Sequence, residues 1–331
     1  MWADEMTARV AHSLESLAAE VAEVTARSGL LSSTASRYSY RWRYFCRWCE
    51  VQHLAVPASS ETVGLFLLAH DDLAHSSLRS MICAIAWGHR TYHHTDPTGD
   101  PGIANVMSHH AREHGTAPRP VDAATANIVA RLLEATEDPH AGSEYWRARI
   151  RSMLTISYLG ALRGQETCML RGPDILVGPD GTLAVRLRQT KSSPGKSVTV
   201  VLDDPSDPRI DVRASLRRLA DIARALEADL SAGHLFRPLL RVGHARSLPD
   251  RPVTRPTYHD DVARLARFAG LDREGLRLGT HSMRRGWATD AAAHGSDVVE
   301  IRRHGRWVRI ATPQSYVVAA AIFDARLQVD Y

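Results

Sequence analysis

The sequence predicts a mainly α-helical protein with a small β-sheet. Apolar residues recur at helical spacing along most of the 331 residues, whereas residues 182–202 alternate with the period of strands. The chain is about twice as long as a usual domain, and a segment with two prolines, residues 116–124, divides it. We therefore expect a helix or tail over 1–27, an all-helical domain over 28–117 and a mixed α/β domain over 118–331.

The composition is that of an ordinary globular protein, with 44% hydrophobic and 24% charged residues. We expect neither a membrane span nor a signal peptide, because no apolar run approaches about 18 residues and the first residues are acidic. Four cysteines are few for this length, which indicates a reducing compartment and a cytoplasmic protein. Cys46 and Cys49 form a single C-x-x-C in a helical pattern, so core packing is favoured over metal or redox chemistry.

The charge is unevenly distributed. Residues 1–117 have a net charge of −3 and residues 118–331 one of +7, which fits a polyanionic partner for the second part. Of the basic residues, 39 are arginine and only Lys191 and Lys196 are lysine. Because a guanidinium cannot give up a proton near neutral pH, Lys191 is a candidate general acid. A solvated cation at a turn explains the same lysine equally well.

The N-terminal part reads as a series of helices. An apolar stripe over residues 10–24 predicts a helix that docks on a neighbouring subunit, packs on its own domain or frays. Further helices are expected at 60–72, 76–92 and 100–114, and the pairs His93–His94 and His109–His110 are expected in loops and on the surface, without metal. Before them, TASRYSYRWRYFCRWCEVQ combines a buried aromatic stripe with arginines that either bind a DNA backbone or are solvated. The stripe is Tyr38, Trp42, Phe45 and Trp48, and the arginines are Arg37, Arg41, Arg43 and Arg47.

The second part mixes helices with a hairpin. Helices are expected at 123–136, 143–158, 211–230 and 257–269, with an arginine- and proline-rich loop before the last. Arg163 and Glu166 are three residues apart, so we expect them to meet on a helix. Their contact is either a structural ion pair or one in which the carboxylate orients the guanidinium or a neighbouring group. Residues 182–202 predict a hairpin whose first strand ends at Lys191, facing inwards with Leu187. No glycine-rich phosphate loop is present, which argues against a nucleotide cofactor.

The stretch from Thr280 to Tyr316 carries the strongest chemical pattern. His281 and Arg284 are three residues apart, so a helix places both on one face, where they can hold a phosphate. A basic run leads to Trp307, and Tyr316 follows nine residues later. Cationic donors beside a phenol indicate chemistry on a phosphodiester with Tyr316 as the attacking group. A tyrosine on a helix is also commonly a core residue.

Taken in order, these motifs resemble those of the tyrosine site-specific recombinases, the phage integrase family. The resemblance spans nearly the whole length and includes SYLGALRGQE, the hairpin lysine, H-x-x-R, the tryptophan, the tyrosine and RWRYFCRWC. It implies a C-shaped clamp on DNA, made of an all-helical core-binding domain and a mixed α/β catalytic domain. It also implies strand exchange through a 3′-phosphotyrosyl bond and a Holliday junction, with no ATP, metal or other cofactor.

The same resemblance implies a role for each site residue. Tyr316 attacks the phosphate, Lys191 protonates the 5′-oxygen and Glu166 buttresses the site. His281 acts as a base or as a hydrogen-bond donor. Arg285 is extra relative to the family pattern, and we expect it and Arg306 to bind the DNA backbone. The groups that hold the phosphate are Arg163, Arg284, His281 and Trp307.

The implied partner is double-stranded DNA with inverted-repeat recombination sites, bound by a homotetramer that is a monomer or weak oligomer when free. The enzyme would be associated with the nucleoid. About 30 residues precede the aromatic helix, too few for a separate arm-site domain, and residues 317–327 predict an apolar helix that docks in trans or packs in cis. Two alternatives stay open: DNA relaxation of the type IB topoisomerase kind, and a non-cleaving helix-turn-helix protein built on 285–310.

Overall fold

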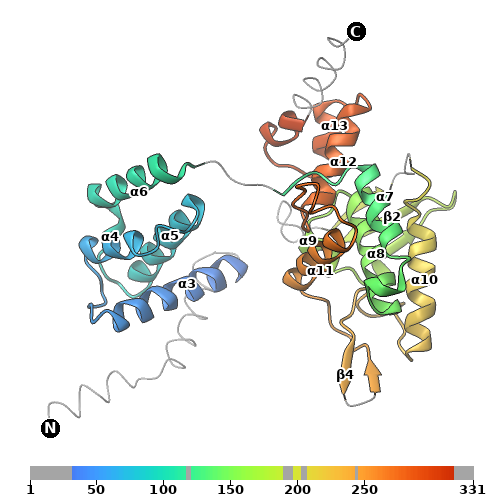
Figure 1. Ribbon diagram of the computed structural model, residues 1–331, viewed down its shortest axis with the longest axis horizontal. Helices are drawn as coiled ribbons and strands as arrows, with labels where there is room; N and C mark the ends of the chain where they lie inside the picture. Colours follow the sequence, from blue (N-terminus) through green and yellow to red (C-terminus); the bar gives the residue numbers. More distant parts are fainter. Residues whose placement is uncertain (1–31, 117–120, 189–196, 203–206, 243–244, 317–331) are drawn as a thin grey trace. The chain divides into compact units, whose positions relative to one another are not determined.

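Two units, residues 1–119 and 120–331, make up the chain (Figure 1). The computed structural model describes residues 32–116, 121–188, 197–202, 207–242 and 245–316. The expected N-terminal helix over 10–24 and the apolar segment after Tyr316 therefore lie outside the described residues. Among the helices that are described, none is both long enough and apolar enough to cross a membrane.

The described part of the first unit is entirely helical, as its sequence predicts. Serine and aspartate side chains start two of the helices: Ser59 accepts a hydrogen bond from the backbone of Thr62, and Asp100 accepts one from Gly102. A short 3₁₀ turn at Pro97–Gly99 precedes the last helix. The helices are α3 Ser32–Val51, α4 Ser60–Leu68, α5 His75–Thr91 and α6 Pro101–His114.

An aromatic core joins α3 to α4 and α5. Trp42 and Phe45 are buried, and the Phe45 ring meets Phe66 of α4 edge-on, with 5.1 Å between the centroids. Gly88 of α5 lies directly under Trp42, where a Cβ would overlap the indole ring. Tyr38 and Trp48 of the predicted stripe are only half-buried. The aromatic period therefore placed α3 correctly, although the ends of the stripe lie at the surface.

The cysteine pair and the histidine pairs of this unit lie in different surroundings. Cys49 is buried in the core of this unit and Cys46 packs against it, and burial raises the pKa of the Cys49 thiol to about 11, consistent with core packing. His109 is exposed, as are His93 and His94, but the expectation of a surface site was wrong for His110. This ring is buried on α6, with its Nε2 3.0 Å from the carbonyl oxygen of Leu73.

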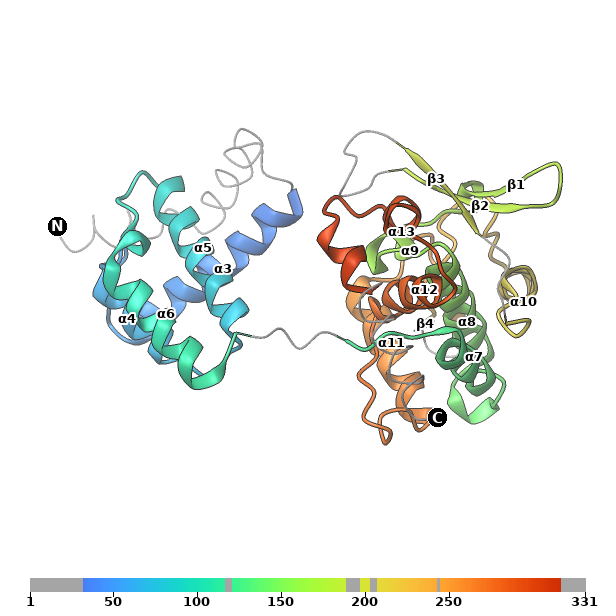
Figure 2. The same ribbon diagram turned by 90° about the horizontal axis from the view of Figure 1, so that it is seen from above.

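The second unit is built around α8, Glu144–Leu159, which is buried along most of its length (Figure 2). Ser143 caps its first turn through the backbone of Trp146. Helices α7, α9, α10, α11 and α12 all pack against it, and their apolar faces form one continuous core. The remaining helices of this unit are α7 Ala126–Ala135, α9 Gly164–Cys168, α10 Val212–Ala225, α11 Arg255–Phe268, α12 Ser282–Ala293 and α13 Val298–Gly305.

Two small antiparallel sheets complete this unit. The first pairs β1 Ile175–Val177 with β2 Leu183–Leu187, and β2 with β3 Val198–Leu202, so that Val185 lies opposite Val200. The predicted hairpin therefore supplies the central strand and one edge strand of a three-stranded sheet, whose first strand was not predicted. Part of the arginine- and proline-rich segment, all of which was expected to be a loop, forms the short hairpin β4 Leu240–Val242 and β5 Ala245–Ser247. Strands of three residues are too short to show a clear alternation in the sequence.

Candidate active site

Arg163 enters the site at a sharp turn after α8. It is not on the body of a helix, as its spacing suggested, but is the N-cap residue of α9. Glu166 is the third residue of that helix, and its carboxylate accepts hydrogen bonds from the Arg163 backbone at 2.9 Å and from Arg163 Nη1 at 2.6 Å. The ion pair thus also closes a helix N-terminus and fixes the direction of the guanidinium.

Glu166 is the carboxylate at the centre of an arginine cluster. The oxygen that accepts from the Arg163 backbone, Oε2, also accepts a hydrogen bond from Arg306 Nη2 at 3.0 Å, and the side chain is only 6% exposed. Burial alone would raise the pKa of this carboxyl, but the Arg306 charge and the contacts with Arg163 lower it below its ordinary value. Glu166 therefore remains ionised and holds two guanidinium groups in place.

Arg306 was expected to bind the DNA backbone, and the structure places it elsewhere. Its side chain is 8% exposed and donates hydrogen bonds to the carbonyl oxygens of Gly160, Ala161 and His304 as well as to Glu166. Arg306 is a left-handed residue, φ +56°, at the end of α13, and this conformation turns its side chain inwards. Its role is to join α13 to the turn before Arg163.

Arg284 lies in the first turn of α12 and is 1% exposed. Its Nη1 donates to the Ala161 carbonyl at 2.6 Å, its Nη2 donates to the Gly305 carbonyl, and its guanidinium carbon lies 4.1 Å from the centre of the Trp307 ring. Burial and the charges of Arg163 and Arg306 lower its pKa to about 9. With three arginines against Glu166, this region has an excess of positive charge that favours an anion.

His281 precedes α12 as its N-cap residue, one position before the helix on which the sequence placed it. Its outer surface is exposed, yet the protein packed around the ring and the charges of Arg284 and Arg285 lower its pKa to about 4. The imidazole is therefore neutral at pH 7. Arg255, at the start of α11, contributes to the same shift and was not singled out by sequence reasoning.

Tyr316 is the last described residue, and residues 311–316 are helical. It is 8% exposed and packs with Ala288 and Ile301, and its ring centre lies 6.0 Å from that of Trp307. The Arg285 guanidinium carbon lies 5.6 Å from the Tyr316 ring centre. Burial raises the pKa of this phenol, and the charges of Arg285 and Arg284 partly offset the rise. Tyr316 is thus partly a core residue and also a neighbour of two arginines.

The sequence of this chain is similar to those of known proteins. Residues 124–321 match the profile described as the phage integrase family. The chain belongs to that family. It is therefore a tyrosine recombinase, an enzyme that acts on DNA. The "Integrase/recombinase xerD homolog" of Selenomonas ruminantium is 28% identical to it over 303 residues, which cover 88% of this chain and 83% of the relative.

Solved structures of low identity share the fold of this integrase-family chain. The XerH site-specific recombinase bound to difH substrate superposes with a TM-score of 0.57 at 15% identity, over 85% of this chain and 76% of that one. A lambda integrase dimer bound to a core site gives a TM-score of 0.54 at 13% identity, over 95% and 80%. The fold is accordingly that of the tyrosine recombinases, with a mainly helical N-terminal region and a catalytic domain that contains small sheets.

Five further expected residues of this recombinase lie outside the described residues or in the first unit. Lys191 lies outside the described residues. Arg37, Arg43 and Arg47 are exposed on α3 in the other unit, whereas Arg41 is half-buried and donates a hydrogen bond to Ser80 of α5. An arginine face on α3 therefore exists, but one of its four expected members also serves packing.

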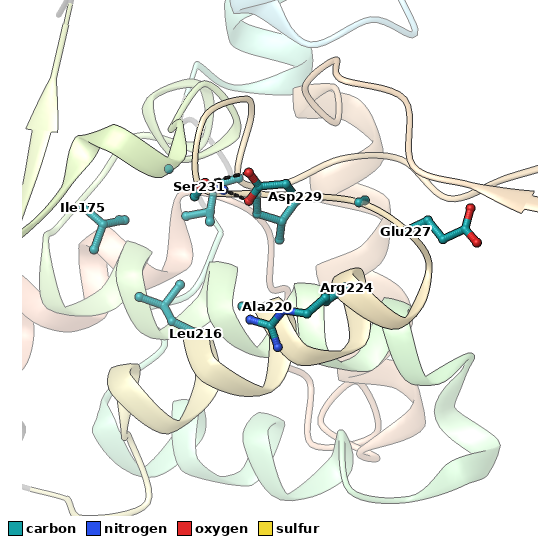
Figure 3. Close-up of a pocket in the computed structure, with 11 residues that line it drawn as sticks. Ile175, Leu216, Ala220, Arg224, Glu227, Asp229 and Ser231 are labelled. Atoms are coloured by element: carbon teal, nitrogen blue, oxygen red, sulfur yellow. Dashed lines mark hydrogen bonds between the residues drawn. The ribbon is translucent and has the colours of Figure 1, made fainter.

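A hollow of about 510 Å³ lies between α10, β1 and the segment 227–235 (Figure 3). Its floor is apolar, with Leu216 and Ala220 from α10, while Asp229 holds its rim by accepting hydrogen bonds from the backbone and hydroxyl of Ser231. Gly172 closes one side, where a Cβ would overlap the Leu230 carbonyl. None of the described catalytic candidates lines this hollow.

Proposed function

We propose that this recombinase exchanges DNA strands at inverted-repeat sites, with Tyr316 as the nucleophile that forms a 3′-phosphotyrosyl bond. The observation that supports this role is a series of contacts that leads from the ion pairs to the tyrosine. Glu166 pairs with Arg163 and with Arg306. Arg284 donates to the carbonyl of Gly305, next to Arg306, and lies on Trp307, whose ring neighbours Tyr316. An isolated core tyrosine would not be expected beside so much uncompensated positive charge. Phosphoryl transfer depends mainly on such positioning and charge stabilisation.

The proposed step conserves atoms and charge. The Tyr316 oxygen forms a bond to phosphorus, its proton leaves, and the bond between phosphorus and the 5′-oxygen breaks. His281, neutral at pH 7, is able to take the phenolic proton, while Arg163, Arg284 and Trp307 hold the phosphate oxygens. The energy of the broken bond is retained in the phosphotyrosine, so a 5′-hydroxyl of a partner strand reverses the step.

Lys191 is proposed to protonate the departing 5′-oxygen. The support is compositional: a chain with 39 arginines retains a lysine at the hairpin, and an ammonium can release a proton where a guanidinium cannot. We expect Lys191→Ala to slow cleavage, and a bridging 5′-sulfur, which leaves without a proton, to restore it. Equal slowing on both substrates would contradict the general-acid role.

The proposed DNA partner is a duplex carrying short inverted repeats. Four copies of the protein would bind two such duplexes at the nucleoid, and strand exchange would pass through a Holliday junction. The order of motifs resembles that of the phage recombinase Cre, a simple recombinase that clamps its core site. Two relatives were solved on DNA, XerH on difH and the lambda integrase dimer on a core site. Duplex binding by the arginine face of α3 is part of this proposal.

The test begins with the Tyr316→Phe variant, which selects its preferred duplex from a random library without cleaving it. A nicked duplex carrying the selected site is then incubated with the wild-type protein and separated under denaturing conditions. We expect a covalent adduct that is absent from Tyr316→Phe, and recombinant strands when two such sites are present. An adduct with relaxation but no exchange would indicate a topoisomerase-like activity, and no adduct would indicate a binding protein.

A further inference from the structure

The two adjacent arginines of α12 have different surroundings. Arg284 is fully buried, both of its Nη atoms donate to carbonyl oxygens, and its guanidinium lies on Trp307. Arg285 is only half-buried, and its guanidinium carbon lies 5.6 Å from the centre of the Tyr316 ring. Its Nε is buried and has no hydrogen-bond partner. Arg285 thus brings a charge and an unused donor to the tyrosine.

An unpartnered buried donor is unfavourable unless a partner arrives during function. The Arg285 backbone nitrogen donates to the His281 carbonyl at 3.1 Å, so α12 fixes the point from which the side chain extends. The partner must carry negative charge to match the guanidinium. Two candidates fit, the phenolate of Tyr316 and a DNA phosphate.

We propose that Arg285 is a positioning residue for the nucleophile, whose guanidinium lies against the Tyr316 ring and stabilises the phenolate that attacks the phosphate. This inference rests on the proposed function of Tyr316. In the step concerned, the phenolic O–H bond breaks, the proton leaves, and the oxygen forms its bond to phosphorus as the 5′-oxygen departs. Arg285 gains no bond and loses no proton; it acts through the charge of the tyrosine oxygen.

The electrostatic surroundings of Tyr316 favour the phenolate over the DNA phosphate as the partner. Among the described residues, the charges that act on the phenol are those of Arg285 and Arg284, both from α12, and Arg285 has the larger effect. α13 contributes the apolar Ile301, and the segment after it contributes Trp307. Because burial opposes ionisation of Tyr316, a nearby cation is needed to bring its pKa down. The sequence had suggested a backbone phosphate as the partner of Arg285.

The first experiment uses the free full-length protein with 3-fluorotyrosine at position 316, so that the fluorine signal reports ionisation of that phenol alone. Arg285→Gln should raise its pKa by about one unit, because the nearest cation is lost. Arg285→Lys keeps the charge and should shift it less. Arg303→Gln, which removes a charge from the exposed side of α13, is the matched control and should leave the pKa unchanged. An unchanged pKa in Arg285→Gln would overturn the inference.

The second experiment measures single-turnover cleavage of the selected nicked duplex against pH. For Arg285→Gln we expect a loss of about tenfold near neutral pH that shrinks as pH rises, because hydroxide then supplies the phenolate. Fluorotyrosine at 316, a more acidic phenol, should restore much of the rate. Binding of the intact duplex serves as the folding control.

The outcomes separate the two candidates. One outcome would be an equal loss of cleavage rate at every pH, together with weaker DNA binding and a salt dependence of the affinity that corresponds to about one phosphate contact fewer. That result would identify Arg285 as a DNA-backbone contact and overturn its proposed role at the tyrosine. A wild-type protein that forms no adduct would contradict the proposed function itself. Normal wild-type cleavage with parallel pH profiles would contradict only the role of Arg285.

Discussion

At the scale of single residues, His281 is the group whose protonation state decides its role. A histidine with its pKa near 4 is neutral at physiological pH, so it is able to accept a proton from Tyr316. When a phosphate dianion or phosphodiester approaches, its negative charge should raise that pKa again. The arginines around the ring therefore keep the imidazole neutral in the free enzyme, and the rise in its pKa on DNA binding should strengthen it as an acceptor for the Tyr316 proton.

We predict that His281 titrates well below the ordinary value of about 6.5 in the free protein. Because the folded-state pKa is lowered, the unfolded chain binds more protons between about pH 4 and 6.5, and His281 makes stability fall with acidification in that window. Imidazole nitrogen shifts measured by NMR check this value. A titration near 6.5 that is unaffected by Arg284→Gln would contradict the electrostatic description.

Glu166 should be a costly carboxylate to neutralise. Glu166→Gln leaves Arg163 and Arg306 uncompensated, and loss of a partner from a buried ion pair costs about 3–5 kcal/mol. The pKa of Glu166 is lower in the folded protein than in the unfolded chain. Its contribution to the free energy of unfolding is therefore present above the unfolded-state pKa of about 4.3 and is lost as pH falls through the folded-state pKa.

Urea unfolding of the wild-type protein and of Glu166→Gln tests the role of Glu166. The substitution should lower the free energy of unfolding by its full amount at pH 7 and by less below about pH 4, where Glu166 is partly protonated. Glu134→Gln is the matched control, since Glu134 pairs with Arg209 at the surface and its loss should cost less than about 1 kcal/mol. Equal costs for the two variants would show that the arginine cluster does not depend on Glu166.

At the scale of elements, α12 is held in place by a close contact between backbones. The Ala124 nitrogen donates to the Ser282 carbonyl at 3.0 Å, and a Cβ on Gly286 would overlap the carbonyl of Ala124. Arg284, Arg285 and His281 all belong to this helix or its cap. A shift of α12 therefore moves most of the site at once.

We expect Gly286→Ala to cost about 1–3 kcal/mol and to slow cleavage, because backbone cannot move aside as a flexible side chain can. Gly64→Ala is the control: it lies inside α4 with nothing within 4 Å, and it should stabilise by about 0.5–1 kcal/mol. Urea unfolding and adduct yield check both. Equal tolerance of the two alanines would contradict the tight packing of α12.

The elements also show what the sequence could predict. Long periodic helices such as α5 and α8 were placed within one or two residues, because their apolar spacing is unambiguous. β1, β4 and β5 were missed because three residues carry too little pattern. The inward turn of Arg306 was missed because a left-handed cap is not visible in a run of basic residues. The residues of the site were named from motifs, but their contacts required the fold.

At the scale of the whole molecule, we propose that the boundary near residue 120 separates two folding units with different tasks. Residues 121–331 contain their own hydrophobic core and every described catalytic candidate. The first unit has a net negative charge, yet it exposes Arg37, Arg43 and Arg47 on α3. This face would add phosphate contacts to those of the second unit.

We predict that residues 121–331 alone unfold cooperatively and bind the selected duplex with a shallower dependence on salt than the full chain, because fewer counterions are released. Binding measured across salt concentrations gives the two slopes. The triple variant Arg37→Gln, Arg43→Gln and Arg47→Gln in the full chain should approach the slope of the fragment. Identical slopes for fragment and full chain would contradict a DNA-binding role for α3.

The most direct measurement of the central claim is the identity of the residue that carries the DNA after cleavage. The adduct from the nicked duplex is digested, and the DNA-linked peptide is identified by mass spectrometry. We predict a single 3′-phosphotyrosyl linkage at Tyr316, beside the arginines of α12. Linkage at any other residue, or an adduct that persists in Tyr316→Phe, would contradict it.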